Sequence, residues 1–220
     1  MTVDGEGVDG QSVARFADSL RRVIGRFVGT TAPPEAFREL ADELDALAER
    51  LAAFDQRSLF EFPDGHAAPG TAGPAVTMFS PVIGRAHPFA PPVRVTAIGR
   101  HVEGQVTFGT AYEGPPGHVH GGFVAATLDE LLGMTLAVQH VPGMTGRLTI
   151  NYRRPTPLHT DLHVVAEVTR VDGRKAYVDG RILDGDTICA EAEGLFVTVD
   201  FGQLARDWAD RSGPSLGDNL

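Results

Sequence analysis

The sequence predicts an α+β protein in which an antiparallel sheet wraps around one buried central helix, preceded by a two-helix extension. Residues 123–138 are almost all apolar or small and favour a helix, which is typical of a helix that is buried on most sides. Segments with the alternating pattern of strands lie on both sides of this run. Two amphipathic helical patterns precede them in the chain.

The composition is that of an ordinary globular protein and argues against several classes of function. The chain has 220 residues, 42% hydrophobic and 22% charged, enough for one domain with an extension. A formal net charge of −10 argues against a nucleic-acid partner, which would need a basic surface. Cys189 is the single cysteine, so no internal disulfide can form, and we expect a cytoplasmic protein. We expect neither a signal peptide nor a membrane span, because no apolar run approaches roughly 20 residues.

Residues 1–55 are expected to form an N-terminal extension whose first ten residues are disordered. Apolar residues recur at helical spacing over residues 13–27 and again over residues 37–51, with two prolines between the two patterns. Each helix has an apolar stripe that must be buried against something. We interpret the stripes as packing on the following domain or on a partner subunit, and the alternative is a regulatory or protein-binding role.

The rest of the chain divides by composition into a strap, a main domain and a tail. Residues 56–92 are rich in proline and glycine without periodicity, which predicts a linker or an irregular strap over the domain surface. Residues 93–200 carry the strand patterns and the central helix. Asp172-Gly173 and Asp184-Gly185 separate the last three strand patterns, and such pairs favour hairpins. Residues 201–220 are expected to be a C-terminal tail with at most a short helix.

The candidate functional residues lie at the beginning and in the middle of the central helix. Gly121 and Gly122 precede the apolar run, and the unpaired N–H groups of a helix N-terminus attract negative charge. Asp129 and Glu130 lie within the run, although a carboxylate is rarely buried unless it is paired or used. We expect Glu130, which points about 100° away from Asp129 around the helix, to be structural and to lie at a subunit contact.

Helix geometry keeps the glycines and the carboxylate apart. Seven residues at about 1.5 Å each place Gly122 and Asp129 roughly 10 Å from one another. One reacting carbonyl group therefore cannot touch both within a single helix. If both act, they come from different subunits, and the active unit is at least a dimer.

The motif His120-Gly121-Gly122, followed after six residues by Asp129-Glu130, resembles that of the hotdog-fold acyl-CoA thioesterases, specifically the phenylacetate-type branch and its relatives. The resemblance covers about half of the chain. It implies the hotdog fold and a thioesterase that hydrolyses an acyl-CoA, or a related acyl thioester, to free acid and thiol. It also implies a homodimer or a dimer of dimers with its active sites at subunit interfaces, and no cofactor beyond the coenzyme A of the substrate.

The resemblance assigns roles to five residues. Asp129 would be the nucleophile or the general base, and the backbone N–H groups of Gly121 and Gly122 would polarise the thioester carbonyl. His120 would fix the loop by hydrogen bonding or act directly. Thr145, expected in a turn after the helix, would orient the attacking water.

Four further residues are candidates for substrate binding. Arg153 and Arg154 are candidates for the phosphates of coenzyme A, and Phe123 for the acyl group. Some relatives carry an amide side chain shortly before the glycines; this chain does not, so His118 or backbone would have to supply that contact. His118 and His120 lack a third ligand at a recognisable spacing, so we predict no metal site.

The sequence also allows two other functions. A hotdog domain could hold acyl-CoA without turnover, or serve as a regulatory scaffold through its N-terminal helices. A hydratase or dehydratase on the same fold resembles a different motif, with a histidine about five residues after the aspartate. Here the next histidine after Asp129 is His140, which disfavours that reaction. The sequence specifies neither the acyl group nor the choice between attack by Asp129 and activation of water.

Overall fold

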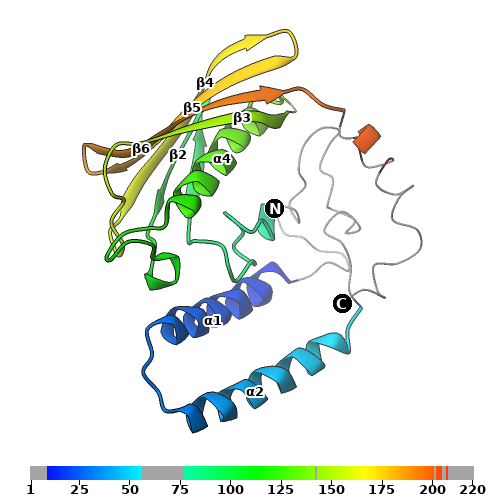
Figure 1. Ribbon diagram of the computed structural model, residues 1–220. Helices are drawn as coiled ribbons and strands as arrows, with labels where there is room; N and C mark the ends of the chain where they lie inside the picture. The colour runs from blue at the N-terminus through cyan, green and yellow to red at the C-terminus, as the bar shows by residue number, and fades with distance from the viewer. Residues whose placement is uncertain (1–8, 56–76, 142, 201, 205–206, 208–220) are drawn as a thin grey trace.

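The computed structural model describes residues 9–55, 77–141, 143–200, 202–204 and 207. Figure 1 shows a curved antiparallel sheet against one helix, α4, with two more helices, α1 and α2, beyond it. The helices are α1 (Gly10–Val28), α2 (Pro34–Ala52), the short 3-10 helix η2 (Thr110–Tyr112) and α4 (Gly121–Val138). The strands are β1 (Arg94–Ile98), β2 (His101–Val106), β3 (Met144–Tyr152), β4 (Leu162–Asp172), β5 (Lys175–Asp184) and β6 (Thr187–Val197).

The six strands form one sheet in the order β1-β2-β4-β5-β6-β3, with every neighbouring pair antiparallel. The two predicted hairpins are confirmed, since Gly173 and Gly185 have φ of 56° and 55° in the β4–β5 and β5–β6 turns. Strand β3 lies at one end of the sheet beside β6. The predicted sheet around a central helix is therefore confirmed. Residues 1–8 of the expected disordered start, the first part of the strap and most of the tail fall outside the described residues. The expected disorder is wrong for Asp9 and Gly10, which are the N-cap and the first residue of α1.

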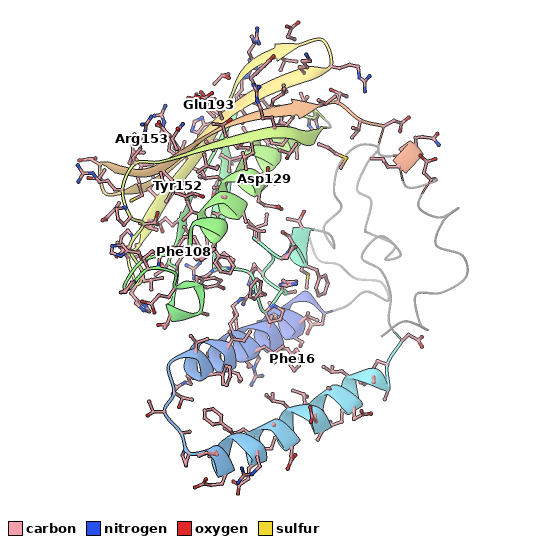
Figure 2. The ribbon with its side chains drawn as sticks, viewed as in Figure 1. Phe16, Phe108, Asp129, Tyr152, Arg153 and Glu193 are labelled. Atoms are coloured by element: carbon pink, nitrogen blue, oxygen red, sulfur yellow. The ribbon has the colours of Figure 1, made fainter. Side chains whose placement is uncertain are left out.

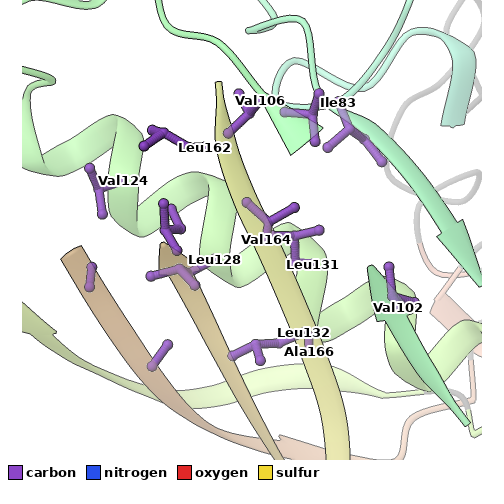
Figure 3. Packing of buried hydrophobic residues seen from close by; sticks show 14 of the residues in the cluster. Ile83, Val102, Val106, Val124, Leu128, Leu131, Leu132, Leu162, Val164 and Ala166 are labelled. Atoms are coloured by element: carbon purple, nitrogen blue, oxygen red, sulfur yellow. The ribbon is translucent and has the colours of Figure 1, made fainter. Parts of the chain in front are cut away.

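Helix α4 packs against the inner face of the sheet. Its buried residues are Val124, Thr127, Leu128, Leu131, Leu132, Thr135 and Leu136. Figure 3 shows Leu131 and Leu132 beside Val164 and Ala166 of β4. A Cβ atom added at Gly180, on β5, would lie 2.9 Å from the Leu132 side chain, so the glycine allows the helix to approach the sheet closely.

The exposure of α4 differs from the expectation of burial on most sides. Phe123, Asp129 and Met134 are only partly buried, because the sheet covers one side of the helix and leaves the other accessible in a single chain. The apolar run of α4 is also longer than expected. By length and composition alone α4 would qualify as a membrane span, a test that the core helix of a soluble protein also passes.

A strap of residues 77–93 connects α1 to α4, and Arg21 of α1 holds it. The Arg21 guanidinium donates hydrogen bonds of 2.7–3.2 Å to four strap carbonyls, those of Gly84, Arg85, His87 and Ala90. It also pairs with Asp18 on its own helix. Among the described residues, Arg21 is the only donor to the Arg85 and Ala90 carbonyls, whereas backbone N–H groups also donate to those of Gly84 and His87.

Replacing Arg21 with methionine is expected to destabilise the strap. The variant keeps much of the aliphatic stem but leaves the Arg85 and Ala90 carbonyls without their donor, which should cost roughly 1–3 kcal/mol. Denaturant unfolding measures the loss. Arg94→Met, at an exposed position on β1, is the matched control and should cost little. Equal losses in the two variants would contradict this role of Arg21 in holding the strap.

Three carboxylates lie side by side on the face of the sheet that points away from α4. Asp179 of β5 is paired in register with Glu167 of β4 and with Glu193 of β6, which Figure 2 labels. Partial burial, followed by the charge of Glu193, raises the pKa of Asp179. Like charges directly across a sheet are unfavourable, so this row carries a stability cost at neutral pH.

Asp179→Asn should therefore stabilise the protein at pH 7, by roughly 0.5–1 kcal/mol. The raised pKa means that the folded state holds this proton more tightly than the unfolded state does. The gain is fully present above the folded pKa, and it disappears below the ordinary value of 3.8, where both states are protonated. Unfolding in urea at pH 7 and near pH 3.5 tests this, and a larger gain at the acidic pH would contradict it.

Candidate active site

The N-terminus of α4 leaves one backbone donor free. His120 is the N-cap residue, and its Nδ1 accepts the N–H of Gly122 at 3.0 Å. Its carbonyl accepts the N–H of Phe123 at 2.9 Å. Among the described residues, no group accepts the N–H of Gly121. The positive end of the helix therefore presents the Gly121 N–H, rather than that of Gly122, to a negatively charged group.

The ring and carbonyl of His120 make hydrogen bonds of the kind that the first of its two expected roles requires, and the role itself remains a prediction. The preceding loop is held by its own hydrogen bonds. The Gly114 N–H donates to the His118 carbonyl at 2.9 Å, and His118 Nδ1 lies 2.8 Å from the Pro116 carbonyl. Gly117 has φ of 75°, a conformation that favours glycine. His118 is half-buried in this loop and supports its shape.

Tyr152, at the end of β3, contacts the start of α4 and was not identified as a site residue from the sequence. Its hydroxyl donates to the Gly121 carbonyl at 2.9 Å. A Cβ atom added at Gly121 would lie 3.3 Å from that hydroxyl. The contact joins residues 31 positions apart, so no local pattern could have predicted it.

Asp129 and Thr145 lie together, as the resemblance implied for two residues of one site. Thr145 Oγ1 donates to Asp129 Oδ1 at 2.9 Å. The expectation that Thr145 lies in a turn is wrong, because it is the second residue of β3, where the register with β6 shifts between Thr145 and Arg147. A bulge of this kind re-aims a side chain without ending the strand. Asp129 is half-buried, and Figure 2 shows it between the two ends of α4.

Glu130 contacts the strap. Ser80 Oγ donates to Glu130 Oε1 at 3.1 Å, and burial raises the pKa of Glu130. The expectation of a structural role agrees with this contact. The contact lies within one chain, and the subunit contact expected for Glu130 remains a prediction. Ser80 had been given no role from the sequence, because its partner lies 50 residues away.

Phe123 belongs to an aromatic cluster near the N-terminus of α4. Its ring centroid lies 5.0 Å from that of Tyr112, 5.5 Å from that of Phe89 and 6.3 Å from that of His120. Tyr112 donates to the Phe89 carbonyl at 3.2 Å, and burial raises the pKa of Tyr112 to about 12. The cluster offers an apolar wall next to the Gly121 N–H.

The two arginines proposed for phosphate binding differ in their surroundings. Arg153 is ion-paired with Glu191, with Nε 2.8 Å from Oε1, so its guanidinium is already engaged. Arg154 is exposed, and its backbone N–H donates to the Cys189 carbonyl at 3.0 Å. Both directly follow Tyr152, which contacts Gly121, so they lie toward the start of α4 and not toward Asp129.

The two reactive features are separated within one chain. Gly121 and Asp129 are eight residues apart on α4, a rise of about 12 Å along the helix. A thioester carbonyl bound at the Gly121 N–H is therefore out of reach of the same chain's Asp129. Within the described ranges, no group of three or more His, Cys, Asp or Glu residues is arranged to hold a metal ion.

Known proteins with similar sequences and structures define the class of this chain. The family model described as "Thioesterase superfamily" matches residues 116–191. The crystal structure of "protein RHA08564, thioesterase superfamily protein" is 36% identical, with a TM-score of 0.76, and the match covers 86% of this chain and 92% of that one. The chain therefore belongs to the thioesterase superfamily, and its fold is the hotdog fold that the resemblance implied.

Curated relatives match over a shorter region. "Acyl-coenzyme A thioesterase THEM4" of Mus musculus is 36% identical over 94 residues, which is 42% of this chain and 40% of the relative. The protein of the same name from Xenopus laevis is 33% identical over 93 residues, 41% of this chain and 42% of the relative. The chain thus matches about two fifths of the length of these relatives.

Proposed function

We propose that the protein is a thioesterase that hydrolyses an acyl-CoA to free acid and coenzyme A. The names of the curated relatives and the membership of the superfamily support this reaction. The observation that carries it is the hydrogen bond of 2.9 Å between Thr145 and Asp129, on a helix whose first N–H is free. A non-catalytic acyl-CoA-binding module would not require that pair.

In the proposed reaction, the free N–H of Gly121 binds the thioester oxygen and stabilises the negative charge that develops on it. Asp129 of a second subunit attacks the carbonyl carbon or takes the proton from an attacking water. Thr145 holds the Asp129 carboxylate, or the water beside it, in position. Coenzyme A leaves as the thiolate and takes up a proton, from water or from the Asp129 that accepted it. If Asp129 is the nucleophile, a water molecule then hydrolyses the resulting anhydride, which releases the free acid and restores the carboxylate.

The proposed site is therefore shared between two copies of the chain, in a homodimer or a dimer of dimers. The separation of about 12 Å between Gly121 and Asp129 within one chain requires this arrangement if both act on one thioester. Phe123 and its aromatic neighbours would contact the acyl group. Arg154, which is exposed, is the better candidate for a coenzyme A phosphate, because Arg153 is engaged by Glu191.

Release of free thiol from a panel of acyl-CoAs, with short, long, branched and aromatic acyl groups, tests the reaction. We expect turnover of at least one class, unaffected by a chelator, since the proposed chemistry uses no metal. Binding of acyl-CoA without thiol release across the panel would instead establish the non-catalytic module.

A further inference from the structure

The N-terminal helices expose two apolar stripes that the rest of the described chain leaves uncovered. Helix α1 buries Ala14 and Ala17 on its inner side, whereas Phe16 and Val23, on its outer side, are 39% and 46% exposed. Figure 2 shows Phe16 on the side of α1 that faces α2. Helix α2 buries no residue at all, and its Leu40 and Leu44 are 52% and 45% exposed.

The two helices of one chain do not cover each other. Phe27 and Phe37 touch near the connecting loop, with ring centroids 6.0 Å apart. Beyond that contact the helices lie apart, as Figure 1 shows. Most of the stability of a helix in a protein comes from packing of its apolar face, and the 19 residues of α2 make few such contacts with the other described segments. The stripe of α2 therefore needs an occupant.

The charges of the helices identify the chemistry of that occupant. Helix α2 carries six acidic residues and two arginines, so it favours a basic partner. Helix α1 carries four arginines and one aspartate, and Arg15, Arg22 and Arg26 are exposed along one side of its outer stripe. The surface that best complements α2 is thus the outer side of an α1 helix.

We propose that α2 of one chain packs against the outer side of α1 in a second copy, and that the two copies exchange these contacts reciprocally. The result is a bundle of four helices in which each apolar stripe is covered and each acidic helix meets a basic one. Because it involves α1 and α2 rather than α4 and β3, this interface is separate from the one proposed for the shared active site. It would join pairs of chains into a larger assembly.

Charge reversal on each helix separately tests the interface. One variant carries Arg22→Glu and Arg26→Glu, and the other carries Glu43→Lys and Asp45→Lys, which lie at the two edges of the stripe of α2. Each variant brings like charges together between copies, so light scattering should give half the mass of the wild-type assembly. The control, Asp42→Lys with Glu49→Lys, changes α2 by the same charge on the side opposite the stripe and should keep the wild-type mass.

Mixing the two variants distinguishes a second copy from an occupant within the same chain. In a mixed pair, the acidic α1 of one variant meets the basic α2 of the other, and the second contact joins the two unaltered helices as in the wild type. We expect the mixture to recover the wild-type mass. Two results would overturn the proposal: variants that keep the wild-type mass, or a mixture that fails to recover it. The first result would show that α2 is covered within its own chain.

Discussion

Asp129→Asn is expected to lower the turnover of acyl-CoA by roughly two orders of magnitude or more. The amide keeps the shape of the side chain and an oxygen that can still accept the Thr145 hydroxyl. It carries no negative charge, so it can neither attack a carbonyl nor accept a proton efficiently. Affinity for the substrate should change little, because the Gly121 N–H and the aromatic cluster are untouched.

Glu130→Gln provides the matched control, since it removes one carboxylate from the adjacent position of α4. Its amide oxygen can still accept the hydrogen bond from Ser80, so turnover should remain near that of the wild type. Thermal unfolding of both variants separates chemistry from folding. Near wild-type turnover of Asp129→Asn would refute its catalytic role, and a large loss of stability would indicate a structural carboxylate instead.

Gly121→Pro should lower turnover by about 10²–10³-fold, the usual effect of losing one oxyanion donor. Proline lacks the N–H but suits the first position of a helix, where that N–H makes no intrahelical bond. His120, with φ of −60° and ψ of 131°, already has the extended conformation that a residue before proline prefers. The helix should therefore form normally in the variant.

Gly121→Ala separates the donor from the bulk of the new side chain. It keeps the N–H and adds a Cβ atom 3.3 Å from the Tyr152 hydroxyl, a contact that a small shift of the tyrosine relieves. We expect a much smaller loss of turnover than for proline. If alanine and proline reduce turnover equally, crowding at the helix end is responsible, and the Gly121 N–H is not the oxyanion donor.

The fold was largely predictable because its signals are local. The apolar run of α4 and the glycine turns at Gly173 and Gly185 each specify their structure within a few residues. The separation of Gly121 from Asp129 also follows from helix geometry alone. These features required no knowledge of tertiary contacts.

Contacts between distant segments were not predictable. The sequence indicated a strap, but not that Arg21 would bind four of its carbonyls or that Ser80 would reach Glu130. The turn expected at Thr145 is a strand with a bulge, because pairing with β6 extends β3 toward the helix. The engagement of Arg153 by Glu191 likewise depends on the register of β3 with β6, which the composition of the two strands does not specify.

The central claim is that Gly121 of one chain and Asp129 of another act on the same thioester. Co-expression of Gly121→Pro chains with Asp129→Asn chains tests it directly. In a mixed dimer, one site contains both altered residues and the other contains neither. We expect each variant alone to be nearly inactive and the equal mixture to recover roughly a quarter of wild-type turnover, since about half of the dimers are mixed and each has one intact site. No recovery in purified mixed dimers would contradict a site shared between chains.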